Sequence, residues 1–216
     1  SSKTLILAPA NSSSDFIWAI PSMRKKQTIT GRMNLSGEFK STFTGKSEIG
    51  PNMAGAFHVT VTKGVIRKFT VLSKILTMLN IPYFAMLKAD DIFENGMPFD
   101  TITSDFIMQH AIMKTENLVL RGPAMNLTAV GDINLLNEHV DLIVGAQILE
   151  TIGRILGTIP IAGELVTGKD KSLTIGYFHV SGPYHDASVT PMPVKSISGP
   201  VLRIFRSILD IPRDLF

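Results

Sequence analysis

Apolar and polar residues alternate along most of the chain, and the alternation is clearest in GDINLLNEHVDLIV, residues 131–144. Period-two alternation predicts a β-hairpin with one apolar and one polar face. The turn-forming Asn137 lies between the two arms. The apolar positions of the two arms are Ile133, Leu135, Val140, Leu142 and Val144. Something must cover this apolar face: the protein's own core, another chain, or a ligand made of hydrocarbon.

Similar segments follow one another from Ile29 onward, each rich in β-branched and aromatic residues and bounded by Gly, Pro, Asn or Asp. Their spacing predicts a many-stranded antiparallel sheet with hairpin connections. The expected strands are 29–39, 40–45, 54–64, 99–109, 110–122, 124–135, 139–147 and 172–182. Two short apolar runs joined by the polar loop NSSS predict edge strands within residues 1–28.

Helical periodicity interrupts the strand pattern in three places. The first is FTVLSKILTMLN, residues 69–80, in which Ile75, Leu76 and Leu79 lie on the apolar side. We expect this helix to pack against the sheet or to lie as a lid across one end of a groove. The second is ILETIGRILGTIP, residues 148–160.

The third helical stretch is GPVLRIFRSILDI, within a C-terminal segment of residues 195–216. Its apolar stripe and two arginines are Val201, Ile204, Phe205 and Ile208 with Arg203 and Arg206. This pattern suits a helix that lies in a membrane interface, with its arginines near lipid phosphates. It also suits a helix that folds back to close the end of the sheet.

These elements predict a β-dominated α+β fold. We expect a large twisted antiparallel sheet that forms a curved groove or half-barrel, with about three short amphipathic helices.

Composition adds a bias towards apolar surface. Charged residues are 18% of the 216, against roughly 25% in soluble domains, and the mean hydropathy is +0.23. One domain over residues 1–216 is expected at this length. The net charge of +3 is spread along the chain, so nucleic acid is not an expected partner. No apolar run approaches the roughly 18 residues of a membrane span, and the abrupt start SSKTLILAP suggests a piece of a longer chain.

The sequence offers little recognisable chemistry. There is no cysteine, so thiolate metal sites and disulfides are excluded. GKS at 45–47 lacks the earlier glycine of a phosphate-binding loop, and DDIFENG lacks the oxygen ligands of a calcium loop. The five histidines are scattered, and no nucleophile motif accompanies Tyr184-His185-Asp186. We therefore expect no catalytic residues, no metal and no cofactor.

Several runs in order carry a resemblance to a known family. GAFHVTVTKGVIRKFTVLSKILTMLN, FDTITSDF, HAIMKTENLVLRGPAMNLTAVGDINLLNEHVDLIV and IPIAGELVTGKDKSLTIGYFHVSGPYHDASVTP follow one another between Met53 and Pro193. This succession resembles the AsmA-like C-terminal module of YhdP/TamB-type Gram-negative envelope proteins. In one departure, Pro183 directly follows the glycine of the final VSG turn.

The resemblance implies a module of a longer protein that is anchored in the inner membrane and extends into the periplasm. It implies a β groove with a hydrocarbon-lined interior that supports phospholipid movement towards the outer membrane, and no catalytic residues. The hairpin 131–144 would then supply part of the groove lining. The strand SLTIGYFHVSG adds Leu173, Ile175 and Tyr177 as further groove candidates.

Three functions remain open from the sequence. The first is a non-enzymatic, passive phospholipid-transfer module, with an acyl-chain lipid as ligand and possible contacts to a membrane surface and to envelope proteins. The second is an assembly or scaffold factor for outer-membrane proteins that pairs through exposed strand edges. The least favoured is an enzyme whose site is assembled in space from distant strands.

Overall fold

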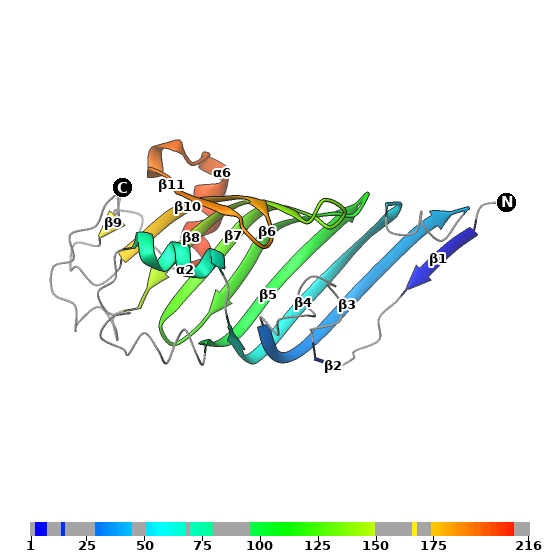
Figure 1. Cartoon of the computed structure of the whole chain (residues 1–216), viewed down its shortest axis with the longest axis horizontal. Coiled ribbons are helices and arrows are strands. Elements are labelled where there is room, and N and C mark those ends of the chain that lie inside the picture. The colour runs from blue at the N-terminus through cyan, green and yellow to red at the C-terminus, as the bar shows by residue number, and fades with distance from the viewer. Residues whose placement is uncertain are drawn as a thin grey trace.

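The computed structural model describes residues 3–7, 14–15, 29–44, 51–67, 70–79, 96–149, 166–167 and 174–209. These residues form one antiparallel sheet of eleven strands (Figure 1). The prediction of a β-dominated fold is therefore confirmed. The strands run side by side from one long edge of the sheet to the other, and the sheet is twisted and curved (Figure 1).

Most of the sheet is a meander in which each strand pairs with the next one along the chain, except that β8 pairs with β10. Its strands are β3 (Ile29–Phe43), β4 (Met53–Ile66), β5 (Met97–Gln109), β6 (Ile112–Arg121), β7 (Met125–Asn134), β8 (His139–Ile148), β10 (Thr174–Pro183) and β11 (Ser188–Pro191). The remaining strands are β1 (Lys3–Leu7) and β2 (Ser14–Asp15), which pair with β3, and β9 (Val166–Thr167), which pairs with β10.

The first strand of the meander differs from the prediction. Two strands were expected at 29–39 and 40–45, but β3 is continuous over 15 residues. Its partner β4 pairs with residues 32–41 without interruption, so the chain does not turn between Phe39 and Lys40. Of the edge strands expected near the N-terminus, the first apolar run forms β1, which pairs with β3. The second apolar run lies outside the described residues, and β2 instead begins at Ser14, the last residue of the expected NSSS loop.

The predicted hairpin is confirmed as β7 and β8, with Asn134 paired to His139. The Asn134 side chain organises the turn, because its Oδ1 accepts hydrogen bonds from the backbone N–H groups of Leu136 (3.0 Å) and Asn137 (3.1 Å). Glu138 completes the turn with a φ of 51°. Asn137 lies in the turn as expected, and the side chain that organises the turn is that of Asn134, at the end of the first arm.

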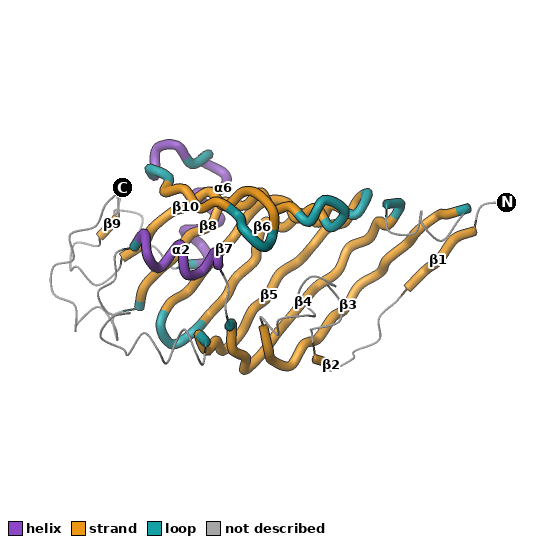
Figure 2. The backbone as a smooth tube through the Cα atoms, viewed as in Figure 1, coloured by secondary structure: helices purple, strands orange, loops and turns teal. Residues whose placement is uncertain are grey.

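The described residues contain two α-helices, α2 (Thr70–Met78) and α6 (Gly199–Ile208), and one 3-10 turn, η3 (Val194–Ser196) (Figure 2). Two of the three expected helices are therefore confirmed. Pro200 lies in the first turn of α6, where the missing N–H has no consequence. The helix expected at 148–160 falls outside the described residues, except for Ile148, which ends β8, and Leu149.

Candidate functional site

One face of the sheet is apolar from β3 to β11, and we call it the apolar face. Cross-strand partners point to the same side of a sheet, so the register connects Leu35 with Val59, Ile133 with Val140, and Val144 with Phe178. The apolar face therefore extends across every strand of the meander. Further members are Met33, Val61, Ile102, Leu118, Leu142 and Val180.

The opposite face, the polar face, carries mainly hydroxyl, amide and charged side chains. Its residues on the first three meander strands include Arg32, Asn34, Ser36, Thr60, Thr62 and Thr103. The alternation read from the sequence thus separates two chemically different surfaces on one sheet.

Helix α2 covers the apolar face at its β11 end. Ile75 and Leu79 are 2% and 1% exposed, and with Leu76 they join the same buried cluster as Phe178 and Val180. These exposures are those of core residues, so the prediction that α2 packs against the sheet is confirmed. Its role as a lid stays a prediction.

The apolar face continues beyond α2 as a second cluster on β3 to β7. Three rings form a row across adjacent strands, with centroids 4.8 Å apart for Phe39 and Phe57 and 5.2 Å apart for Phe57 and Phe106. Half-buried residues surround the row, among them Leu35 and Val59. No helix of the described residues covers this cluster. We call it the uncovered part of the apolar face because neither α2 nor α6 lies over it; Phe57 and Phe106 are themselves buried, at 9% and 8% exposed. Its aromatic row was missed from the sequence, although AGAFHVTV contains Phe57.

The groove candidates of the hairpin all lie on the apolar face. Ile133 and Leu135 are half-buried in the uncovered part, next to Phe57 and Phe106. Val140, Leu142 and Val144 belong to the cluster beneath α2, with Val144 buried and the other two half-buried.

The two described candidates on β10 lie elsewhere, which corrects the prediction that they line the same surface. Ile175 pairs with Gln147 and Tyr177 with Gly145, which places both side chains on the polar face. They are 0% and 2% exposed beneath α6. Both faces of β10 carry apolar side chains, so alternation in the sequence did not reveal which of these side chains face α2 and which face α6. Leu173 lies outside the described residues.

Helix α6 folds back onto the polar face. Phe205 is fully buried and stacks on Tyr177, with ring centroids 5.7 Å apart. Gly145 allows this approach, because a β-carbon there would lie 3.3 Å from Phe205 Cδ2. Burial raises the pKa of Tyr177 to about 12, an effect that the nearby Arg206 partly opposes.

The C-terminal end of α6 is also held by polar contacts. Gln147 Nε2 donates to the backbone oxygen of Leu209 (3.1 Å), and an Arg121 guanidinium nitrogen donates to that of Ile208 (3.3 Å). These donors satisfy carbonyls that a helix end leaves without partners.

Of the two alternatives for α6, the structure therefore has the helix that closes the sheet. Phe205 cannot face a membrane in this arrangement, which corrects its assignment to the interface. Val201, Ile204 and Ile208 are half-buried, Arg206 is half-buried, and Arg203 is exposed. Contact of these residues with a membrane stays a prediction.

Two histidine–aspartate pairs lie on the polar face. His58 Nδ1 is 2.6 Å from Asp105 Oδ1, and His179 Nε2 is 2.7 Å from Asp141 Oδ1. The hydrogen bond from His58, and then that from Asn117, hold the pKa of Asp105 below its usual value of 3.8. All four side chains of the pairs are more than 40% exposed, so we interpret them as cross-strand pairs that support the sheet.

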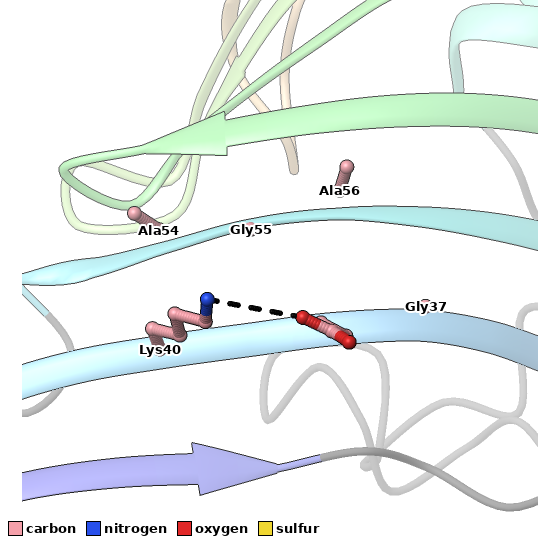
Figure 3. Close-up of a pocket in the computed structure, with 6 residues that line it drawn as sticks. Gly37, Lys40, Ala54, Gly55 and Ala56 are labelled. Atoms are coloured by element: carbon pink, nitrogen blue, oxygen red, sulfur yellow. Dashed lines mark ion pairs between the residues drawn. The ribbon is translucent and has the colours of Figure 1, made fainter.

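A shallow hollow of about 380 Å³ lies over β3 and β4. Small residues and an ion pair line it: Gly37, Ala54, Gly55, Ala56 and the Lys40–Glu38 pair (3.9 Å) (Figure 3). The register puts Lys40 and Ala54 on the polar face, so the hollow is separate from the apolar face.

Two further findings limit the chemistry of the described residues. They contain no group of three His, Asp or Glu side chains placed to hold a metal ion. Neither of their α-helices has the length and apolar character needed to cross a membrane.

Comparison with known proteins identifies the family. The family model described as YhdP protein matches residues 19–189, which is more than half of the chain. The chain belongs to the YhdP family. The resemblance to an AsmA-like, YhdP-type module is therefore confirmed, and α6 lies beyond the residues that the family model matches.

This YhdP-family chain is similar in sequence to the intermembrane phospholipid transporter YhdP of Escherichia coli (strain K12). The two are 25% identical over 151 residues, which cover 62% of this chain and 12% of the relative. The chain thus spans about an eighth of the relative's length. No solved structure matches the chain.

Proposed function

We propose that this chain is a non-enzymatic lipid-transfer module in which phospholipid acyl chains lie along the apolar face. The observation that carries the proposal is the continuity of that face from β3 to β11, with the uncovered part on β3 to β7. Each methylene group that leaves water on such a surface contributes about 0.8 kcal/mol. Half-buried side chains such as Leu35 and Val59 leave area for this contact.

The polar face supports the same function. Strands with hydroxyl and charged side chains on one side and hydrocarbon on the other let a sheet stand in water while it holds lipid. The headgroups would stay in water, and the protein would contribute only the removal of acyl chains from it. No reaction step is needed, so transfer would be passive.

Family membership and the relative's name support the finer part of the proposal. The relative is named as an intermembrane phospholipid transporter, and it is far longer than this chain. We propose that this chain is a single periplasmic module of a longer protein anchored in the inner membrane of a Gram-negative bacterium. It would move phospholipid between the inner and outer membranes and so maintain the outer membrane.

The β11 edge of the sheet is a poor site for pairing with a partner strand. β11 has four residues, ends in Pro191, and is followed by Met192 and Pro193. Short edge strands and prolines discourage the addition of another strand. This observation favours lipid transfer over an assembly factor that would pair through this edge.

Neighbouring residues on β4 allow a matched test. Val59 lies on the apolar face and Thr60 on the polar face; both are β-branched and half-buried. We expect the purified parent to carry phospholipid, measured by native mass spectrometry and lipid extraction. Val59→Asp should lose most of it, because the carboxylate meets the acyl chains, whereas Thr60→Asp should keep it.

Val59→Ala separates lipid loss from loss of stability, since it removes packing but adds no charge. This variant should melt earlier than the parent and still carry lipid. A parent that purifies free of lipid would contradict the proposal and favour the assembly function. Equal lipid loss in Val59→Asp and Thr60→Asp would also contradict it.

A further inference from the structure

Lys63 of β4 has a backbone conformation that its side chain does not favour. Its φ is 51°, in the left-handed region where residues other than Gly, Asn and Asp are uncommon. The side chain is exposed and forms no ion pair with the carboxylates of the described residues. Such an outlier persists only when the surrounding structure imposes it, and it justifies a search for a function.

A β-bulge imposes this conformation. Thr30 pairs with Val65 and Arg32 with Thr62, so β4 places two residues, Lys63 and Gly64, where β3 has one. Bulges redirect side chains and are frequent at the rims of curved sheets and next to binding sites. The bulge therefore places the exposed side chain of Lys63, a cation, near the end of β4.

Other cations lie at the same ends of the strands. Arg67 follows β4, and its stem lies against Gly96, where a β-carbon would be 2.6 Å from Arg67 Cγ. We call this row of strand ends, which includes Lys63 and Arg67, the basic rim. Arg32 and Arg121 are also near it, but the register directs both towards the polar face. In the described part of the chain, the carboxylates at this rim are Asp100 and Asp15, the cross-strand partner of Arg32.

The turns at the opposite ends of the strands differ from the basic rim in charge. Its turns at 109–112, 134–139 and 183–188 contain no Lys or Arg and carry the acids Glu138 and Asp186. Among the residues that the structure describes, these three turns thus differ in charge from the end of β4, which carries Lys63 and Arg67.

The apolar face begins directly beside the basic rim. Val61 and Ile66 flank the bulge and are 2% and 6% exposed, and Phe99 reaches the position where a β-carbon on Gly64 would be. Hydrocarbon and cations therefore meet within a few residues of one strand. A phospholipid has the same order of groups, with acyl chains next to a phosphate.

We propose that Lys63 and Arg67 bind the phosphate of a phospholipid whose acyl chains lie on the apolar face, so that headgroups lie along the basic rim. This inference rests on the proposed function and adds the position of the headgroup to it. Because the field of two or more cations favours net negative charge, anionic phospholipids such as phosphatidylglycerol are preferred over zwitterionic ones. Guanidinium and ammonium groups are both suited to phosphate oxygens.

The test compares two lysines with the same charge. Lys63→Asn removes one positive charge and suits a φ of 51°, so its melting temperature should equal or exceed that of the parent. Lys40→Asn, the control, removes one charge from an exposed site on the polar face. The full chain is incubated with vesicles of phosphatidylglycerol, and bound lipid is counted by native mass spectrometry. Diacylglycerol, with the same acyl chains and no phosphate, is measured in parallel.

We expect Lys63→Asn to lower phosphatidylglycerol binding about fivefold, the effect of one cation near a lipid phosphate. Lys40→Asn should leave it unchanged, and diacylglycerol should bind equally to all three proteins. Arg67→Gln should reproduce the loss.

The remaining outcomes are distinguishable. If the parent binds phosphatidylglycerol and diacylglycerol but Lys63→Asn and Lys40→Asn behave alike, the headgroup inference is wrong and the proposed function stands. If the parent binds neither lipid, both are wrong. If inorganic phosphate displaces phosphatidylglycerol more strongly than chloride does at equal ionic strength, the rim is a site for free phosphate and the assignment to a lipid headgroup is overturned.

Discussion

Lys74 of α2 forms an ion pair with Asp186 in the β10–β11 turn, with Nζ 3.0 Å from Oδ1 across 112 residues of sequence. The same Nζ donates to the backbone oxygen of Ala187 at 2.9 Å. A helix that follows β4 is thereby attached to the last turn of the sheet. The attachment keeps α2 over the β11 end of the apolar face.

Lys74→Met should lower the melting temperature modestly at neutral pH, since the pair is partly exposed. The hydrogen bond from Lys74 holds the pKa of Asp186 below 3.8. A depressed pKa stabilises the fold above the unfolded-state value and ceases to do so as the pH falls through the folded-state value. The difference between parent and variant should therefore shrink below pH 3.8, as measured by thermal melts at several pH values.

Lys114→Met is the control, because the Lys114–Asp132 pair (2.9 Å) joins neighbouring strands and does not hold α2. Its effect on proteolysis of α2 should be absent, whereas Lys74→Met should expose α2 to protease. A pH-independent difference for Lys74→Met would assign its effect to the Ala187 carbonyl and not to the ion pair.

The stacking of Phe205 on Tyr177 predicts a large contribution of α6 to stability. Phe205→Ala removes a fully buried ring and should lower the free energy of unfolding by about 3–5 kcal/mol. Urea denaturation measures the change. Arg203→Ala, on the exposed side of the same helix, should change it by less than about 0.5 kcal/mol. Similar values for the two variants would mean that α6 does not dock in solution.

The close contact at Gly145 of β8 allows a second test of the docking of α6 on the sheet. A β-carbon there would lie 3.2 Å from Thr128 Cγ2 and 3.3 Å from Phe205 Cδ2, so the larger side chain of Gly145→Val must displace α6. The expected loss is about 1–3 kcal/mol. Gly199→Ala is the control, because nothing lies within 4 Å of a β-carbon at Gly199. A Gly145→Val protein as stable as the parent would contradict the packing of α6 on β8.

The strands could be predicted from the sequence because most of them keep apolar and polar side chains on separate faces. Leu35, Val59 and Ile133 each alternate with polar neighbours, and the period of two then follows from the pleat. The amphipathic helices α2 and α6 were visible for the same reason at a period of 3.6.

The failures arose where this separation disappears. β10 has Ile175 and Tyr177 on one face and Phe178 and Val180 on the other, because helices cover both sides of the sheet at that strand. Periodicity cannot assign a face to such a strand. The conformation of Lys63 was also beyond prediction, since it depends on the register of β4 against β3.

Two groove candidates on β8, Val144 and Leu142, allow a comparison between a buried and a more accessible position of the apolar face. Val144 is buried and Leu142 is half-buried on the same face. Val144→Asp buries an unpaired carboxylate and should destabilise the fold by several kcal/mol. Leu142→Asp should cost less stability and lose more lipid per folded chain. Circular dichroism melts and lipid extraction check the pair, and mutants that melt like the parent and keep their lipid would count against both expectations.

The exposed side of α6 allows a test of membrane contact. Deletion of residues 199–216 should weaken co-sedimentation with anionic vesicles at low salt, but it also removes the buried Phe205 and so lowers stability. Arg203→Glu avoids this difficulty, because Arg203 is exposed. It should melt like the parent and, if α6 lies in the interface, lose binding by about fivefold for each unit of charge. Lys40→Glu changes the net charge equally at the opposite end of the sheet and should bind as the parent does. Equal binding by parent, Arg203→Glu and Lys40→Glu would limit α6 to closing the sheet, since an interfacial helix with a reversed charge must be repelled by anionic lipid.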